Sequence, residues 1–179
     1  MGIGWKGSST HRHRGGGGEG LSGGDDTPKG FDTARPVLEL AVVMDGTMSM
    51  RKHFESFHAS LTTAMSWIKD AVGDHATVKW AVVVYTDFPK KANIGLGEFA
   101  AETLCDFETD TSRVASIVEA YKGATGYDWA EDFQSGVQQA LDLSWTEHSL
   151  KVFIGVLDAP PHGIGNEKHD NYPQGSPTG

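Results

Sequence analysis

Three oxygen-bearing side chains stand at alternate positions in the segment Asp45-Gly46-Thr47-Met48-Ser49. A carboxylate and two hydroxyls suit a hard cation such as Mg²⁺, which prefers oxygen ligands and keeps several waters. Alternate positions in a loop can face the same way, so these three side chains could line one wall of a cation site. The alternative is a purely structural role within this segment. Thr47 or Ser49 would cap the following helix, and Asp45 would stabilise the positive end of that helix.

The residues on either side of this segment predict a strand followed by a helix. Seven of the eight residues in 37–44 are apolar, which is typical of a strand buried on both faces of a parallel sheet. Apolar residues then recur at spacings of three and four through residues 54–72, as in an amphipathic helix. Asp45 therefore lies at the carboxyl end of a strand, where open α/β sheets bind ligands.

Further strands and helices follow along the chain. Residues 77–85 and 151–157 are apolar runs that predict buried strands, and residues 98–107 predict a shorter one. Residues 109–111 offer an N-cap to a helix that follows them. The alternation of strands and helices predicts an α/β fold, with a Rossmann-like, open, mostly parallel sheet and helices on both faces.

The loop before the last predicted helix carries two more acids. Asp128 is followed three residues later by Glu131, which resembles a capping box for that helix. A helix cap is the commoner role of an aspartate in such a place, and it is the structural alternative to a ligand role for Asp128.

Another carboxylate ends the last predicted strand. Asp158 precedes two prolines, which prevent the strand from continuing. If the first and last strands are neighbours, Asp45 and Asp158 converge. Two nearby carboxylates repel each other, and a cation relieves that repulsion. We interpret His162 as a turn residue rather than a base, within hydrogen-bonding reach of the region of Asp158.

Composition and charge restrict the class of protein. With 38% hydrophobic and 22% charged residues, the chain is globular in composition, and its net charge of −9 disfavours nucleic acid as a partner. No stretch approaches the ~20 apolar residues of a membrane span. The single cysteine, Cys105, is expected in the core and excludes an internal disulfide. With no apolar signal core at the N-terminus, these features predict a cytoplasmic protein.

The chain divides into three parts by composition. Residues 1–36 hold eleven of the 23 glycines and predict a disordered tail. Within that tail His11 and His13 could bind a transition metal weakly, although tail histidines are usually just solvated. Residues 37–172 predict one domain, and residues 173–179 a second disordered tail.

The motifs, taken in order, resemble those of a von Willebrand factor A (vWA) domain. The metal-ion-dependent adhesion site (MIDAS) of that family begins with Asp-x-Ser/Thr-x-Ser, matched by Asp45, Thr47 and Ser49. Its second element is a Thr or, in one intracellular branch, an Asp in a Gly-rich loop, matched by Asp128. Its third is an Asp that ends the fourth strand, matched by Asp158. The closer likeness is to that branch, found in fungal and other eukaryotic proteins and beside alpha-kinases.

This resemblance implies a binding module. Mg²⁺ or Mn²⁺ would be held by the five matched residues, directly or through water, and an open coordination position would accept a carboxylate from a protein partner. The sequence departs from the branch at Thr125 and Tyr127, which interrupt a run of glycines, and at Ala130, which replaces a proline. The family also continues with two further strands and a closing helix. We therefore expect a C-terminally truncated domain with an uncovered apolar edge and poor solubility; the oligomeric state is not predicted.

The sequence leaves two other functions open. The first is a degenerate or truncated remnant that binds no metal, because ligands need a rigid frame. The second is a phosphatase of the haloacid-dehalogenase type, whose Asp-x-Asp-Gly-Thr motif resembles residues 43–47. Its nucleophile would fall at Val43, which has no nucleophilic group, so we do not expect an enzyme.

Overall fold

The computed structural model describes residues 35–88, 99–164 and 168–176. The segment 1–34, which holds nearly all of the predicted N-terminal tail, lies outside these residues. The strands are β1 (Val37–Asp45), β2 (Thr77–Tyr85), β3 (Ala101–Glu108) and β4 (Leu150–Val156), and the α-helices are α1 (Phe54–Val72), α2 (Thr111–Ala120) and α3 (Phe133–Leu141). Two short 3-10 helices, η1 (Met48–His53) and η2 (Gly73–His75), flank α1.

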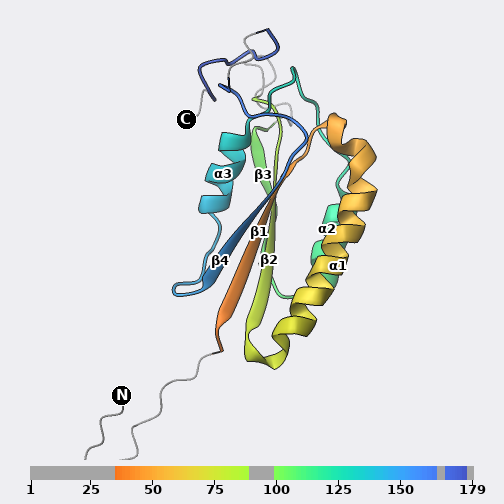
Figure 1. Ribbon diagram of the computed structural model, residues 1–179, viewed down its shortest axis with the longest axis vertical. Helices are drawn as coiled ribbons and strands as arrows, with labels where there is room; N and C mark the ends of the chain where they lie inside the picture. Colours follow the sequence, from red (N-terminus) through yellow and green to blue (C-terminus); the bar gives the residue numbers. More distant parts are fainter. Residues whose placement is uncertain (1–34, 89–98, 165–167, 177–179) are drawn as a thin grey trace, which may run out of the picture. The chain divides into compact units, whose positions relative to one another are not determined.

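The four strands form one mixed sheet in the order β3-β2-β1-β4. The central strand β1 is parallel to both β2 and β4, whereas β3 is antiparallel to β2. The predicted open, mostly parallel sheet is therefore confirmed. Because β1 and β4 are neighbours, Met44 lies beside Val156, and the segments after both strands leave the same end of the sheet (Figure 1).

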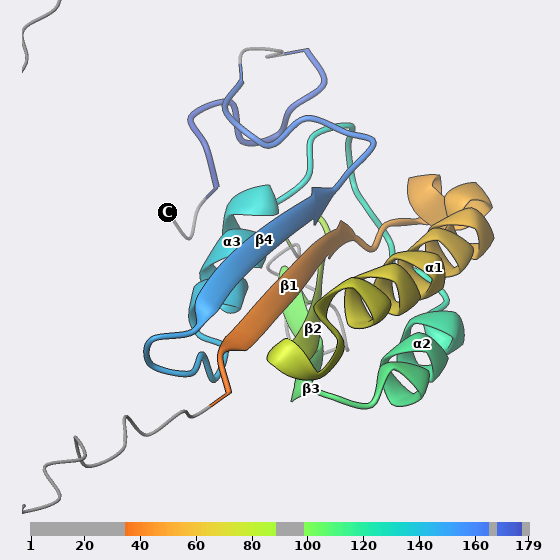
Figure 2. The same cartoon turned by 60° about the horizontal axis from the view of Figure 1, so that its bottom comes forward.

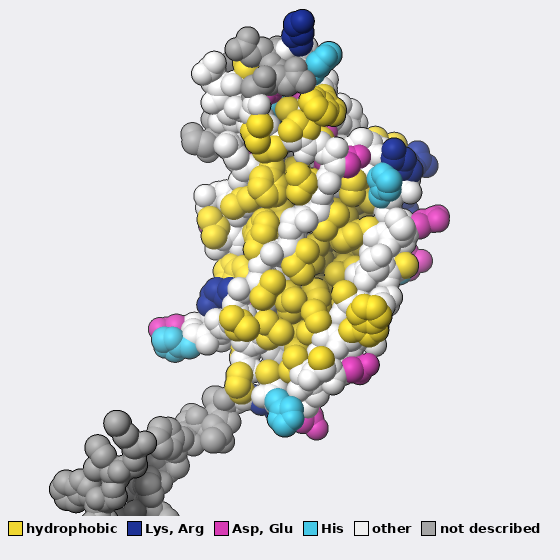
Figure 3. Space-filling view, viewed as in Figure 1, with side chains coloured by type: hydrophobic (Ala, Val, Ile, Leu, Met, Phe, Trp, Pro, Cys, Tyr) yellow, Lys and Arg dark blue, Asp and Glu magenta, His cyan; other side chains and the backbone are white. Residues whose placement is uncertain are grey.

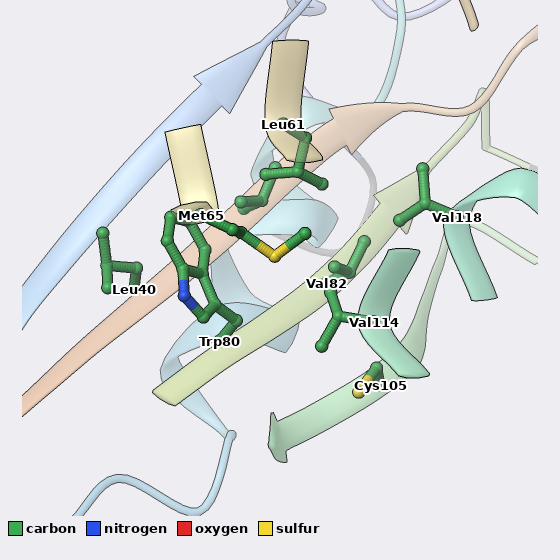
Figure 4. Close-up of a cluster of buried hydrophobic side chains, with 9 residues drawn as sticks. Leu40, Leu61, Met65, Trp80, Val82, Cys105, Val114 and Val118 are labelled. Atoms are coloured by element: carbon green, nitrogen blue, oxygen red, sulfur yellow. The ribbon is translucent and has the colours of Figure 1, made fainter. Parts of the chain in front are cut away.

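Helices cover both faces of the sheet. On one face α1 and α2 pack against a core that includes Leu40, Trp80 and Val82, and this core contains the buried Cys105 (Figure 4). On the other face α3 packs against a smaller core around Val43 and Tyr85. Figure 2 shows α1 and α2 on one side of the strands and α3 on the other. No helix among the described residues is long and apolar enough to cross a membrane.

The edge strand β4 is only partly covered. The side chains of Leu150 and Phe153 are 67% and 45% exposed, and Leu157 just beyond the strand is 46% exposed. Figure 3 shows hydrophobic side chains gathered over β4 and β1 beside α1. Within the described sheet, β4 has a strand partner on one side only, as the sequence predicted. An apolar edge of this kind can pair with another chain.

One helix cap agrees with the sequence and one differs. Asp110 caps α2, where its side chain accepts hydrogen bonds from the backbone of Ser112 and Arg113. The cap of α3 is Asp132, which accepts from the backbone of Ser135, so the capping box predicted from Asp128 and Glu131 is wrong. An N-cap side chain bonds two or three residues ahead, and α3 begins at Phe133, too far along for Asp128.

Candidate functional site

Asp45 and Thr47 form the inner part of the candidate site. Asp45 is the last residue of β1 and is fully buried. Its Oδ1 accepts hydrogen bonds from the Thr47 backbone nitrogen at 2.9 Å and from the Thr47 hydroxyl at 2.8 Å. Burial raises the pKa of Asp45, against the hydrogen bonds from Thr47, and the negative charge of Asp158 raises it further.

Ser49 and Asp158 form the outer part. The hydroxyls of Thr47 and Ser49 lie 2.9 Å apart, and the Ser49 hydroxyl donates to Oδ1 of Asp158 at 3.0 Å. The structure thus brings together four of the five residues that the sequence predicted as ligands. Asp45 and Thr47 are buried, whereas Ser49 and Asp158 are exposed. The group therefore runs from the interior to the solvent.

These four side chains have too few hydrogens for their contacts. Two hydroxyls supply two hydrogens, but three short oxygen–oxygen contacts connect Asp45, Thr47, Ser49 and Asp158. With both carboxylates ionised, at least one contact has no hydrogen in it. An added proton or a bound cation would relieve this shortage. All the side-chain atoms offered are oxygens, which fits an ion such as Mg²⁺.

The helix-cap alternative for this loop finds no support in the geometry. Thr47 occupies the N-cap position of η1, but its side chain makes no capping hydrogen bond. His53, at the N-cap of α1, makes none either. The hydroxyl of Thr47 is directed to Asp45 and Ser49 instead.

The backbone of this loop is fixed from both sides. The Gly46 nitrogen donates to the Tyr85 carbonyl at 2.7 Å, and the Gly46 oxygen accepts from the Ala124 nitrogen at 2.8 Å and from the Tyr121 hydroxyl at 3.0 Å. A Cβ on Gly46 would collide with the ring of Tyr121. Glycine is therefore required here because another side chain approaches the backbone closely.

Glu131, which the sequence predicted only as part of a capping box, is a neighbour of this site. It is 4% exposed, and its side chain hydrogen-bonds with Thr47. Burial, then the charges of Asp45 and Asp87, raise the pKa of Glu131 to about 9. The sequence did hold a signal for this role of Glu131. Asp132 directly precedes the helix and is the better N-cap, which leaves Glu131 available for another role.

Three buried polar atoms near the site have no hydrogen-bond partner among the described residues. They are Oδ2 of Asp45, Oε2 of Glu131 and the hydroxyl of Tyr85. Burial raises the pKa of Tyr85, and the charges of Asp45, Glu131 and Asp158 raise it further. These four side chains therefore share one electrostatic environment. Buried polar atoms are almost always satisfied. These three orphaned atoms therefore offer unfilled hydrogen-bonding or coordination positions to a water or an ion.

Asp128, the fifth predicted ligand, lies in another group. Asp128, Asp87 and His162 each offer a ligand atom, and these atoms lie within 4.8 Å of one another. In the part of the chain that the structure describes, no other group of three such residues is this close. His162 bonds Asp87 at 3.1 Å and Asp170 at 2.7 Å. The expected hydrogen bond of His162 near Asp158 is therefore wrong.

Comparison with known proteins supports the fold. No family model matches the chain. Among solved structures, the open conformation of the pilus adhesin SpaC from Lactobacillus rhamnosus GG is 13% identical, with a TM-score of 0.54 over 72% of this chain and 15% of that one. The vWF domain of the type V pili tip protein Mfa5 from Porphyromonas gingivalis is 21% identical, with a TM-score of 0.48 over 66% of this chain and 36% of that one.

The described residues form a vWA-like domain, as the sheet order and the flanking helices indicate. Among curated proteins, the chain is similar to the alpha-protein kinase vwkA of Dictyostelium discoideum. The two are 26% identical over 149 residues, which is 82% of this chain and 22% of the kinase. The chain thus spans about a fifth of the length of that relative.

Proposed function

We propose that this domain is a divalent-cation-dependent protein-binding module that recognises an acidic group on its partner. The ion is Mg²⁺ or Mn²⁺, bound by Asp45, Thr47, Ser49 and Asp158, with Glu131 close enough to contribute directly or through water. The observation that carries the proposal is the continuous chain of contacts from buried Asp45 to exposed Asp158, which leaves Oδ2 of Asp45 without a partner.

The exposure of the outer residues supports a role in binding. Ser49 and Asp158 face solvent, so an ion held there keeps coordination positions that a partner can reach. Mg²⁺ usually retains waters rather than a full set of protein ligands. The charges of Asp45 and Asp158 balance a dication, and the ion can then accept one further carboxylate.

The surface beside the ion site favours an acidic partner. A shallow pocket of about 480 Å³ next to Ser49 is lined by Met48, Arg51, Lys52 and Glu55. Two cations beside the site oppose the net charge of −9 of the whole chain. Opposite charge at the rim raises the association rate of an acidic partner and disfavours basic ones.

We further propose that the domain binds rather than catalyses. Val43, which would occupy the nucleophile position of a haloacid-dehalogenase phosphatase, is fully buried and carries no nucleophilic group. A generic phenyl phosphate should therefore not be hydrolysed above the rate of the Asp45→Asn variant. Hydrolysis that depends on Asp45 would contradict this part of the proposal.

Calorimetric titration of Mg²⁺ tests the cation site. Asp45→Asn keeps the shape of the side chain but removes its charge, and it should weaken Mg²⁺ binding by at least tenfold. Asp70→Asn, at an exposed position of α1, is the matched control and should bind as the unaltered chain does. Equal affinity in Asp45→Asn would refute the site. If the unaltered chain binds no Mg²⁺ and is not stabilised by it, the remnant alternative holds instead.

Partner capture tests the proposed recognition of an acidic group on a partner. Partners retained on the immobilised chain in Mg²⁺ should be released by chelation and lost with Ser49→Ala, while Asp70→Asn should retain them. Competition by a Glu-containing peptide, compared with its Gln counterpart, identifies an acidic group as the contact. Retention that survives both chelation and Ser49→Ala would mean that binding does not use the ion.

A further inference from the structure

A second group of metal-ligand side chains lies beside the first. Asp87 follows β2, Asp128 precedes α3 and His162 follows β4, so three separate loops converge. Asp87 and His162 are buried, and Asp128 is partly buried. The group differs from the first in its chemistry because it contains an imidazole nitrogen.

His162 is held in the orientation that a metal ligand needs. Its Nδ1 lies 2.7 Å from Oδ1 of Asp170, and Asp170 itself accepts hydrogen bonds from the backbone nitrogens of Gly163 and Tyr172. With Nδ1 donating to this carboxylate, Nε2 faces the group. Metal-bound histidines almost always donate their other ring hydrogen to a carboxylate, carbonyl or water in this way.

The contact between His162 and Asp87 requires a positive species. Nε2 lies 3.1 Å from Oδ1 of Asp87, and in a neutral imidazole whose hydrogen is on Nδ1 this nitrogen carries a lone pair. A lone pair facing a carboxylate oxygen is repulsive. Either a proton or a metal cation must lie between them.

Asp128 supplies the observation that favours a metal ion over a proton alone. Its Oδ1 is buried and has no hydrogen-bond partner among the described residues. Its Oδ2 is already used by the backbone nitrogen of Asn171 at 2.5 Å. A proton shared between His162 and Asp87 leaves this oxygen unsatisfied, whereas an ion bound by all three side chains satisfies it.

We infer that Asp87, Asp128 and His162 bind a first-row transition metal, best matched by Zn²⁺, at a site separate from the Mg²⁺ site. Imidazole favours Zn²⁺ and its neighbours in the series over Mg²⁺. Ligands at about 2.0–2.1 Å from a tetrahedral Zn²⁺ lie roughly 3.4 Å apart. The contact of 3.1 Å between His162 and Asp87 already fits, and the limit of 4.8 Å for the whole group requires only a small closure. A water completes the coordination, and Asp170 is a positioning residue.

Such an ion would join three loops around the first site. The backbone nitrogen of His162 donates to the backbone oxygen of Glu131. The backbone nitrogen of Glu131 in turn donates to the backbone oxygen of Pro160, two residues after Asp158. The loops that hold Glu131 and Asp158 would therefore be fixed by the second ion. This inference does not depend on the proposed function, because it concerns different ligands and a different metal.

The test is Zn²⁺ titration of the full chain after removal of metals. His11→Asn and His13→Asn are introduced throughout, so that these two N-terminal histidines cannot bind the added ion. We expect one Zn²⁺ per chain by calorimetry, a rise in melting temperature, and a visible absorption band when Co²⁺ replaces Zn²⁺. His162→Gln should abolish the band and weaken Zn²⁺ binding at least 100-fold, and Asp170→Asn should weaken it about 10- to 100-fold.

Two further variants keep the test decisive. Asp128→Asn retains the oxygen that accepts from Asn171, so it should fold even if His162→Gln does not, and it should also lose Zn²⁺. Asp45→Asn should lose Mg²⁺ but keep Zn²⁺. Zn²⁺ binding that is unchanged in both His162→Gln and Asp128→Asn, or that is lost in Asp45→Asn, would overturn the inference. Absence of stoichiometric Zn²⁺ binding by the parent chain would overturn it as well.

Discussion

Ser49 and Asp158 are separated by 109 positions in the sequence, yet the hydroxyl of Ser49 donates to Oδ1 of Asp158 at 3.0 Å. The contact exists because β1 and β4 are parallel neighbours in the sheet. Each residue follows its strand at the same end. The candidate ion site is thus a property of strand order, and no local segment of the chain could form it alone.

Asp158→Asn should change stability in opposite directions with and without metal. In a chelator, the loss of one of two neighbouring negative charges relieves the repulsion that Asp158 exerts on Asp45. The free energy of unfolding of the variant should then rise by less than about 1 kcal/mol, because the pair reaches solvent. Its melting temperature should rise slightly as a result. In Mg²⁺ it should melt lower than the parent, because ligand binding stabilises only a protein that binds the ligand.

Differential scanning fluorimetry in both conditions measures this reversal. The variant keeps an oxygen that can accept from Ser49, so its packing should be unchanged. The same shift in chelator and in Mg²⁺ would show that Asp158 acts on stability without an ion.

Glu39→Gln should remove part of the loss of stability in acid. Glu39 is buried in β1, where burial would raise its pKa, but hydrogen bonds from Thr146, Ser149 and Lys79 lower the pKa to about 2 from an ordinary 4.5. A carboxyl group whose pKa is lower in the folded than in the unfolded state stabilises the folded protein at pH values above its unfolded-state pKa. That stabilisation is lost as pH falls from about 4.5 to about 2, and amounts to on the order of 3 kcal/mol.

Urea unfolding between pH 7 and pH 2.5 measures this contribution. The parent should lose stability steeply below pH 4.5, while Glu39→Gln should start less stable at pH 7 and show a shallower decline. Parallel curves for the two proteins would mean that Glu39 titrates normally in the folded state.

Gly136→Ala should destabilise α3 against the sheet. A Cβ at Gly136 would lie 2.9 Å from the Tyr85 ring and 3.0 Å from a methyl of Val43. Overpacking of a rigid core costs about 1–3 kcal/mol. Gly155→Ala, in β4, is the control, because its added Cβ would meet nothing nearer than 3.5 Å. Denaturant midpoints compare the two, and equal midpoints would show that α3 moves away freely.

Leu150→Lys should reduce self-association through β4. Leu150 is 67% exposed on the edge strand, and a lysine on an edge opposes strand pairing between molecules. Trp67→Lys changes a residue of α1 that is 72% exposed and should have a smaller effect. Sedimentation velocity over a range of concentrations measures the association. A parent chain that stays monomeric at all of them would contradict the prediction.

The sequence predicted β1, β2 and β4 well because each is a largely apolar run of the right length, whereas β3 has only a few apolar residues among polar ones. The neighbouring positions of β1 and β4 could only be stated as a condition, since strand order is not written in either strand. With that condition met, the meeting of Asp45, Thr47, Ser49 and Asp158 follows directly.

The loops were harder to predict because polar residues there have several equivalent uses. Asp128, Glu131 and Asp132 all precede α3 closely enough to be considered as caps, and only the backbone shows that Asp132 takes that role. His162 lies near Asp158 in sequence but contacts Asp87, 75 positions away. Contacts between loops of this kind depend on how three chain segments fold together, which periodicity does not report.

The gradient of burial from Asp45 to Asp158 has a kinetic consequence. An ion bound at the proposed site would enter and leave past Ser49 and Asp158, because Asp45 at the other end is fully buried. A partner that binds over this outer pair would block the exit and trap the ion. The dissociation of the metal should then become as slow as that of the partner, so that a weakly held ion becomes a long-lived part of the complex.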